Sequence, residues 1–116
     1  MGFGARTRQV GGVTILDVRG RFTLVEGQAL HDLLLDLFRA GRRKVLLNFR
    51  DVDYMDSSGL GELVRALYTS RKHDAELRMV DLTPRVSAVL KVTNLQSMLA
   101  DYSDEGSAVE SFSQGD

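Results

Sequence analysis

One stretch of sequence organises the rest of the chain: Val52-Asp53-Tyr54-Met55-Asp56-Ser57-Ser58-Gly59-Leu60-Gly61-Glu62-Leu63. It begins where a predicted strand ends and finishes inside a predicted helix. Its turn brings together two hydroxyls and, with Asp51, three carboxylates. The first N–H groups of a helix have no partner within it and carry a partial positive charge, so a side-chain oxygen can cap them. The sequence leaves open whether Asp56, Ser57 or Ser58 is that cap.

Upstream of this stretch, the sequence predicts two strands and a helix. Residues 5–10 and 13–19 are the strands, and Gly11-Gly12 between them suits a tight hairpin turn. Residues 20–25 are expected to form a loop. Helical spacing follows, because apolar side chains then recur along one stripe. The stripe consists of Leu30, Leu33, Leu34, Leu37 and Phe38.

Downstream, strands and helices alternate. The predicted elements are a strand over residues 44–49, a helix from about 60 to 72, a strand over 76–82, a helix that begins at Thr83-Pro84, a strand over 98–102 and a helix over 105–112. The run at 44–49 is almost wholly apolar, which is typical of a central parallel strand covered on both faces. A cap residue followed by proline is a favourable helix start.

The predicted order is β-β-α-β-α-β-α-β-α. Strands that alternate with helices imply parallel βαβ units, with the first strand antiparallel at one edge. We predict an α/β fold in a single domain, with a mixed, mostly parallel sheet of four or five strands and about four helices. Its core spans residues 5–112, and 113–116 form a flexible tail. Partners of such sheets meet the loops after the strands, so 20–25 and 51–58 are expected to lie near each other.

The composition favours a soluble, cytoplasmic protein. A chain of 116 residues, 43% of them apolar, can bury its own core, and the absence of cysteine excludes disulfides and thiolate zinc sites. The 15 basic and 16 acidic residues give a net charge of -1, without the basic excess of a nucleic-acid-binding surface. No apolar run approaches the roughly 18 residues of a membrane span. We therefore expect neither a nucleic acid nor a membrane as partner.

The two serines lack the surroundings of a catalytic nucleophile. A nucleophile elbow needs glycine two residues before and two residues after the serine, and neither Ser57 nor Ser58 has both. The general base would have to be His31, beside the apolar stripe, or His73, after the second helix. We expect both histidines to be exposed to solvent. The sequence therefore predicts a protein that is not an enzyme and has no catalytic residues.

Metal and nucleotide sites are also poorly matched. Three acidic residues match ligand positions of a calcium-binding loop, but Met55 and Asp56 replace an oxygen ligand and a turn glycine. The three are Asp51, Asp53 and Glu62. Phosphate-loop and dinucleotide signatures are missing, and Gly59-x-Gly61 alone is weak support for nucleotide binding. We predict no metal and no cofactor.

A helix start that carries hydroxyls suits a switch as well as a cap. A phosphate on Ser57 or Ser58 would bring about -1.5 to -2 charges and three acceptor oxygens to this turn. The unpartnered N–H groups would donate hydrogen bonds to these oxygens without refolding the domain, while Asp53 and Asp56 would repel the phosphate. A partner surface built for a neutral serine would then meet a buried dianion. We expect an unchanged fold with altered binding.

The segment from Asp56 to Gly61, after the lead-in Val52-x-Tyr54-Met55, resembles the signature of STAS domains, specifically of bacterial anti-sigma factor antagonists. The resemblance covers roughly residues 8–112. It includes the opening strands and the Leu-rich helix as well as three short segments. These are Gly20-x-Phe22, Leu82-Thr83-Pro84 and Val92-Thr93-Asn94-Leu95.

This resemblance implies a binding partner and a phosphorylated residue. The unphosphorylated antagonist would bind an anti-sigma factor with serine kinase activity and so free a sigma factor. The kinase would phosphorylate Ser57, the first serine of the motif, and a serine phosphatase would reverse this. The kinase would hold the ATP, so the chain itself needs no cofactor. The implied docking surface consists of Thr23, Asp53, Tyr54, Asp56, Ser58, Gly59, Leu60 and Gly61.

One position departs from the family pattern. Many members carry aspartate where this chain has Thr23, in the segment beside the phosphorylation site. The change could alter the choice of partner or relax control by phosphorylation, and it leaves Ser57 untouched. The alternative is a structural or scaffold STAS module without a phosphorylation cycle, in a larger signalling or lipid-transport complex.

Overall fold

The computed structural model describes residues 4–94, 101–102 and 104–112. Its elements are β1 (Gly4–Val10), β2 (Val13–Phe22), α1 (Leu24–Arg39), β3 (Lys44–Met55), α2 (Ser57–Lys72), β4 (Glu76–Val80), α3 (Pro84–Val92), β5 (Asp101–Tyr102) and α4 (Glu105–Glu110). The predicted order of strands and helices is confirmed. The tail predicted at 113–116 and the first part of the strand predicted at 98–102 lie outside the described residues.

The five strands form one sheet in the order β1-β2-β3-β4-β5. β1 pairs antiparallel with β2, and each later pair is parallel. Gly11 and Gly12 turn the chain between β1 and β2 with φ of 55° and 83°, a region that glycine enters without steric strain. The predicted α/β fold with a mixed, mostly parallel sheet is confirmed.

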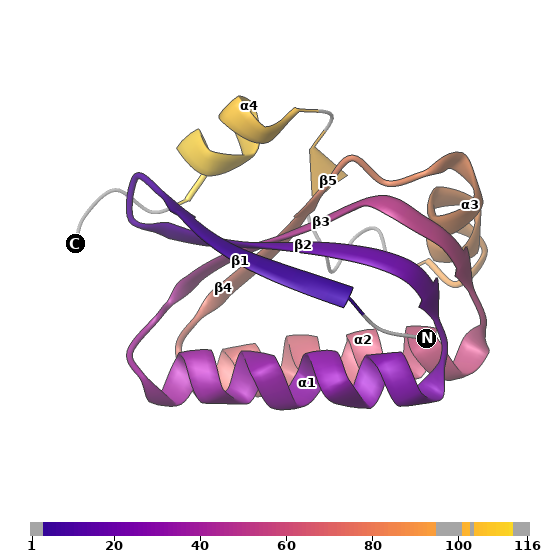
Figure 1. Ribbon diagram of the computed structural model, residues 1–116, viewed down its shortest axis with the longest axis horizontal. Helices are drawn as coiled ribbons and strands as arrows, with labels where there is room; N and C mark the ends of the chain where they lie inside the picture. The colour runs from indigo at the N-terminus through magenta and orange to yellow at the C-terminus, as the bar shows by residue number, and fades with distance from the viewer. Residues whose placement is uncertain (1–3, 95–100, 103, 113–116) are drawn as a thin grey trace.

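Helices cover the two faces of the sheet unequally (Figure 1). α1 and α2 lie side by side across one face, and with α3 they enclose the larger core, which includes Leu34, Phe49 and Leu63. α4 packs on the opposite face over a smaller core that includes Ile15 and Ala108. The central strands are therefore apolar on both faces over part of their length, as the run at 44–49 predicts.

β2 and β3 extend further than the sequence predicts. They pair in parallel as far as Phe22 and Met55, so the loop expected at 20–25 is largely strand and helix. The same is true of the loop expected at 51–58. Both of these predictions are wrong, because one residue rather than a loop separates each strand from its helix.

Polar residues at the end of β3 explain the error. Val52 and Met55 are buried beneath the sheet, while Asp51 and Asp53 are exposed. A strand with one uncovered face can alternate buried apolar and exposed acidic residues in this way. In the sequence alone, closely spaced carboxylates are more typical of a loop. A register shift at Gly20, where φ is 96°, makes the end of β2 harder to predict from the sequence.

Both histidines also differ from the prediction of exposed rings. His31 is only 5% exposed between α1 and α2, and its Nε2 lies 2.7 Å from Oγ1 of Thr69. His73 is half-buried, with its ring centroid 5.8 Å from that of Phe38. The prediction is wrong because α1 packs against α2 as well as on the sheet, so residues beside its apolar stripe are covered too.

α3 begins as predicted. Thr83 is its N-cap, and the backbone N–H of Val86 donates a hydrogen bond of 3.3 Å to the Thr83 hydroxyl, with Pro84 at the first helical position. Val86 and Leu90, two of three apolar residues on one side of this helix, are buried in the larger core. The third residue, Val89, is half-buried and packs at the margin of that core.

Candidate functional site

Asp56 caps the start of α2. Its backbone is extended, with φ of -113° and ψ of -178°, and its Oδ1 accepts a hydrogen bond of 2.9 Å from the N–H of Gly59. The cap that the sequence left open is therefore Asp56 rather than a serine. Ser57 and Ser58 are both exposed, and in the part of the chain that the structure describes neither hydroxyl has a hydrogen-bond partner.

The start of α1 is capped in a different way. Thr23 is the N-cap residue, and its N–H donates a hydrogen bond of 2.9 Å to Oε1 of Glu26. The Thr23 hydroxyl donates to the same oxygen. These bonds, with that from the hydroxyl contributing most, hold the pKa of Glu26 below its ordinary value. The charged side chain of Glu26 thus engages both polar groups of the cap residue.

These two helix starts are neighbours at the carboxyl edge of the sheet. Phe22 and Met55 are paired, so Thr23 and Asp56 follow at the same edge. Gly59 lets α2 approach this edge closely, because a Cβ at Gly59 would lie 2.0 Å from the carbonyl oxygen of Phe22. The expectation that the two segments lie near each other is confirmed. The close contact also gives Gly59 a packing role.

The residues predicted for docking differ widely in exposure. Asp53, Ser58 and Gly61 are exposed; Thr23, Tyr54 and Asp56 are half-buried; Gly59 and Leu60 are buried. The guanidinium of Arg21 lies 4.2 Å from the centroid of the Tyr54 ring, so this ring is already covered on one face by a cation. Gly59 and Leu60 therefore contribute to packing, whereas Asp53, Ser58 and Gly61 are accessible to a partner.

A groove of about 310 Å³ adjoins the start of α2. We call it the Ser57 groove. The residues that line it include Met55, Ser57, Leu60, Ala88, Val89 and Val92. The first three come from the end of β3 and the start of α2, and the others come from α3. Sequence analysis missed this groove because it requires α3 to dock beside residues that are distant in the chain. The one available signal was the apolar Val92 at the exposed end of a helix.

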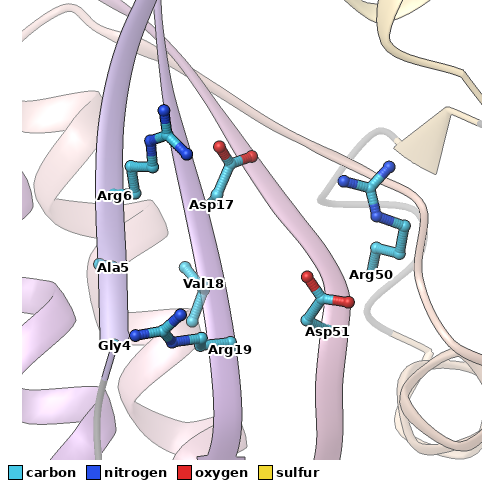
Figure 2. Close-up of a pocket in the computed structure, with 8 residues that line it drawn as sticks. All are labelled: Gly4, Ala5, Arg6, Asp17, Val18, Arg19, Arg50 and Asp51. Carbon is cyan, nitrogen blue, oxygen red and sulfur yellow. The ribbon is translucent and has the colours of Figure 1, made fainter.

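A second hollow, also of about 310 Å³, lies over β1, β2 and β3 (Figure 2). Side chains that line it include Arg6, Asp17, Arg50 and Asp51. Arg8 holds the carboxylate of Asp17 through hydrogen bonds of 2.6 and 2.9 Å, which keep the pKa of Asp17 below its ordinary value. Asp51, the carboxylate just before the quoted stretch, therefore lines this charged hollow rather than the Ser57 groove.

Acidic side chains that match a calcium-binding loop in sequence do not gather in space. Over residues 4–94, 101–102 and 104–112, no group of three or more His, Cys, Asp or Glu side chains is placed to hold a metal ion. Glu62, one of the acidic residues in that match, is instead bonded to Arg65 at 2.8 Å. Among the described helices, none has the length and apolar character needed to cross a bilayer.

Known proteins resemble this chain in sequence and in fold. A model of the STAS domain matches residues 5–108. The chain is 29% identical over 93 residues to the anti-sigma-B factor antagonist of Staphylococcus aureus, which covers 80% of this chain and 84% of that protein. Among solved structures, an anti-sigma factor antagonist from Mycobacterium paratuberculosis has a TM-score of 0.81 at 17% identity, covering 94% of this chain and 92% of its own.

The anti-sigma factor antagonist SpoIIAA shares the same fold in its unphosphorylated and phosphorylated forms. Its unphosphorylated form has a TM-score of 0.76 at 16% identity, covering 92% of this chain and 94% of that one. Its phosphorylated form, from Bacillus, has a TM-score of 0.71 at 16% identity, covering 92% of this chain and 97% of that one. At these identities, the likeness establishes the fold.

Proposed function

The chain belongs to the STAS domain family, and we propose that it is an anti-sigma factor antagonist that is switched off by phosphorylation of Ser57. The unphosphorylated chain binds an anti-sigma factor with serine kinase activity and so frees a sigma factor. The kinase phosphorylates Ser57 and the complex dissociates, after which a serine phosphatase resets the chain. The chain is thus a single-domain, cytoplasmic binding protein and not an enzyme.

The exposed hydroxyl of Ser57 is the observation that carries this proposal. Asp56 already satisfies the N–H of Gly59, so the fold does not need the serine as a cap. A phosphate on Ser57 would add about -1.5 to -2 charges at a surface position. A partner that closes over a neutral serine would then have to bury a dianion, which is strongly unfavourable. Binding changes while the fold is retained.

Two relatives support the same function. The Staphylococcus aureus relative is named an anti-sigma-B factor antagonist, and SpoIIAA is a protein with both unphosphorylated and phosphorylated forms. By analogy, the partner covers Ser57 together with the residues around it. These are Thr23, Asp53, Tyr54, Asp56, Ser58, Gly59, Leu60 and Gly61.

Phosphate transfer tests the proposal. The purified chain is incubated with radiolabelled ATP and the anti-sigma factor kinase encoded beside its gene, and incorporation into Ser57→Ala is compared with the parent. We expect the substitution to abolish incorporation. Ser107→Ala is the matched control, because Ser107 also lies near the start of an Asp-capped helix but its hydroxyl donates to Asp104 at 3.0 Å. This control should accept phosphate as the parent does.

Two other results would contradict all or part of the proposal. Incorporation into Ser57→Ala at the parent's rate would show that Ser57 is not the acceptor. A parent that neither binds the kinase nor accepts phosphate would point to the alternative, a STAS module with a structural or scaffold role. Co-purification with components of a signalling assembly or a lipid transporter would then support that role.

A further inference from the structure

The Ser57 groove lies directly beside the proposed phosphorylation site, and we propose that it receives an apolar side chain of the kinase that acts on Ser57. This inference rests on the proposed function and adds a second point of contact to it. α3 and the start of α2 lie at the same end of the sheet (Figure 1). A partner that reaches Ser57 therefore meets the groove as well, since Ser57 is part of its wall.

The polar side chains that line the groove, apart from the free hydroxyl of Ser57, make hydrogen bonds within the chain. Oδ1 of Asp56 accepts from the N–H of Gly59. The hydroxyl of Thr93 lies 3.0 Å from the carbonyl oxygen of Val89 and 3.2 Å from that of Leu90, and it donates back to this turn of α3. What remains for a partner is the Ser57 hydroxyl, which is the proposed acceptor, and aliphatic surface from β3, α2 and α3. An apolar side chain would displace water from this aliphatic surface without breaking a hydrogen bond within the chain.

Exposure along the groove indicates an open docking surface. At the base, Leu60 is only 7% exposed, whereas Val92 at the rim is 87% exposed. Val92 is the most exposed of the large apolar side chains in the described part of the chain. The lining residues include the carboxylate of Asp56 and neither lysine nor arginine, so the groove does not attract an anionic segment. Its chemistry selects an uncharged, apolar occupant.

The position of Ser57 in the groove wall couples this contact to phosphorylation. A phosphate on Ser57 would place a dianion next to the position that the apolar side chain of the kinase occupies in the groove. The occupant could then remain only by stripping water from that charge, which is unfavourable. Ser57 phosphorylation would therefore empty the groove as well as repel the surface over the serine, and both contacts of the partner are lost together.

Steady-state kinetics of phosphate transfer test the groove. The parent, Val92→Lys and Val10→Lys are each titrated as substrates of the purified anti-sigma factor kinase at saturating ATP. Val10→Lys is the matched control, since Val10 is 37% exposed at the far end of β1, outside the groove. We expect Val92→Lys to raise KM about tenfold with kcat within about twofold of the parent. Val10→Lys should leave both constants unchanged.

The outcomes separate this inference from the function on which it rests. Phosphorylation of the parent on Ser57 together with an unchanged KM for Val92→Lys would overturn the groove contact and leave the proposed function standing. A parent that is not phosphorylated would overturn both. Sedimentation at the same concentrations supplies a third outcome: a dimer of the parent that Val92→Lys dissociates would place a second copy in the groove and would also overturn the proposal.

Discussion

The starts of α1 and α2 are built alike but are completed by different side chains. Each follows a paired strand after a single residue with extended backbone, Thr23 for α1 and Asp56 for α2. At α1, the carboxylate of Glu26 binds both the N–H and the hydroxyl of Thr23. At α2, the carboxylate belongs to the cap residue itself, and the hydroxyl of Ser57 beside it stays exposed.

Under the proposed function, this difference means that a hydroxyl at a helix start is not by itself sufficient for phosphorylation. A phosphate on Thr23 would first break a hydrogen bond to Glu26 and would then stand beside that carboxylate. A phosphate on Ser57 breaks no hydrogen bond within the described residues. The free hydroxyl, more than the helix start, distinguishes the second site from the first.

Breaking the contact between the two starts should have the largest effect on stability. Gly59→Ala would place a Cβ 2.0 Å from the carbonyl oxygen of Phe22, and backbone atoms cannot yield as a flexible side chain can. We expect the free energy of unfolding to fall by about 3 kcal/mol. Urea denaturation measures this change, and a variant as stable as the parent would contradict the close contact.

Gly61→Ala is the matched control for that substitution. A Cβ at Gly61 meets nothing within 4 Å, although the residue lies on the same turn of α2. Alanine has the higher helix propensity, so we expect this variant to gain roughly 0.5–1 kcal/mol. A loss of stability in Gly61→Ala would show that the first effect comes from helix geometry rather than from Phe22.

Removing the two capping carboxylates, one at each helix start, should have a smaller effect on stability. Asp56→Ala deletes the side chain that accepts a hydrogen bond from the N–H of Gly59 and should cost about 1 kcal/mol. Glu26→Ala should cost less, about 0.5 kcal/mol, because the hydroxyl of Thr23 is then free to accept from the helix. Chemical denaturation of both variants gives the ranking. A larger loss for Glu26→Ala would contradict it.

At the interface between α1 and α2, we expect a further and smaller effect, which is a dependence of stability on pH. Burial, and secondly the charge of Arg65, lower the pKa of His31 below its ordinary value of 6.5, although Asp32 and Glu62 oppose the shift. The folded state thus holds a neutral ring that the unfolded chain protonates more readily. Stability should be constant above about pH 6.5 and should fall as the pH drops below it, until the folded pKa is reached.

A variant that cannot titrate tests this pH dependence. His31→Gln keeps a polar group for Thr69, whose hydroxyl lies 2.7 Å from the His31 ring, but it takes up no proton in this range. Urea denaturation at about pH 7.5 and about pH 5.5 should show a smaller difference for His31→Gln than for the parent. An equal difference in the two proteins would assign the effect to other groups.

Much of the fold follows from local sequence patterns. The apolar stripe of α1, the hairpin glycines Gly11-Gly12 and the cap at Thr83 each predict a structure that is present. The ends of β2 and β3 could not be predicted in this way. They are held by pairing with each other, and a carboxylate such as Asp53 on an open sheet face resembles one in a loop.

The candidate site is predictable to a lesser extent. The proposal of Ser57 follows from the motif. The choice of Asp56 as the cap depends on a helix boundary that shifts by a residue or more in any sequence-based assignment. The Ser57 groove depends on α3 docking beside Leu60, and the burial of His31 depends on α1 packing against α2. Such contacts are set by tertiary packing, which residue spacing does not report.

Binding of the kinase before and after phosphorylation tests the central claim most directly. The parent and its enzymatically Ser57-phosphorylated form are titrated into the anti-sigma factor kinase by calorimetry, and the melting temperature of each form is measured alone. We predict that phosphorylation raises Kd by about 100-fold and moves the melting temperature by no more than about 4 °C. Equal Kd values, or a fall in melting temperature large enough to unfold the chain during the titration, would contradict a switch that acts on binding alone.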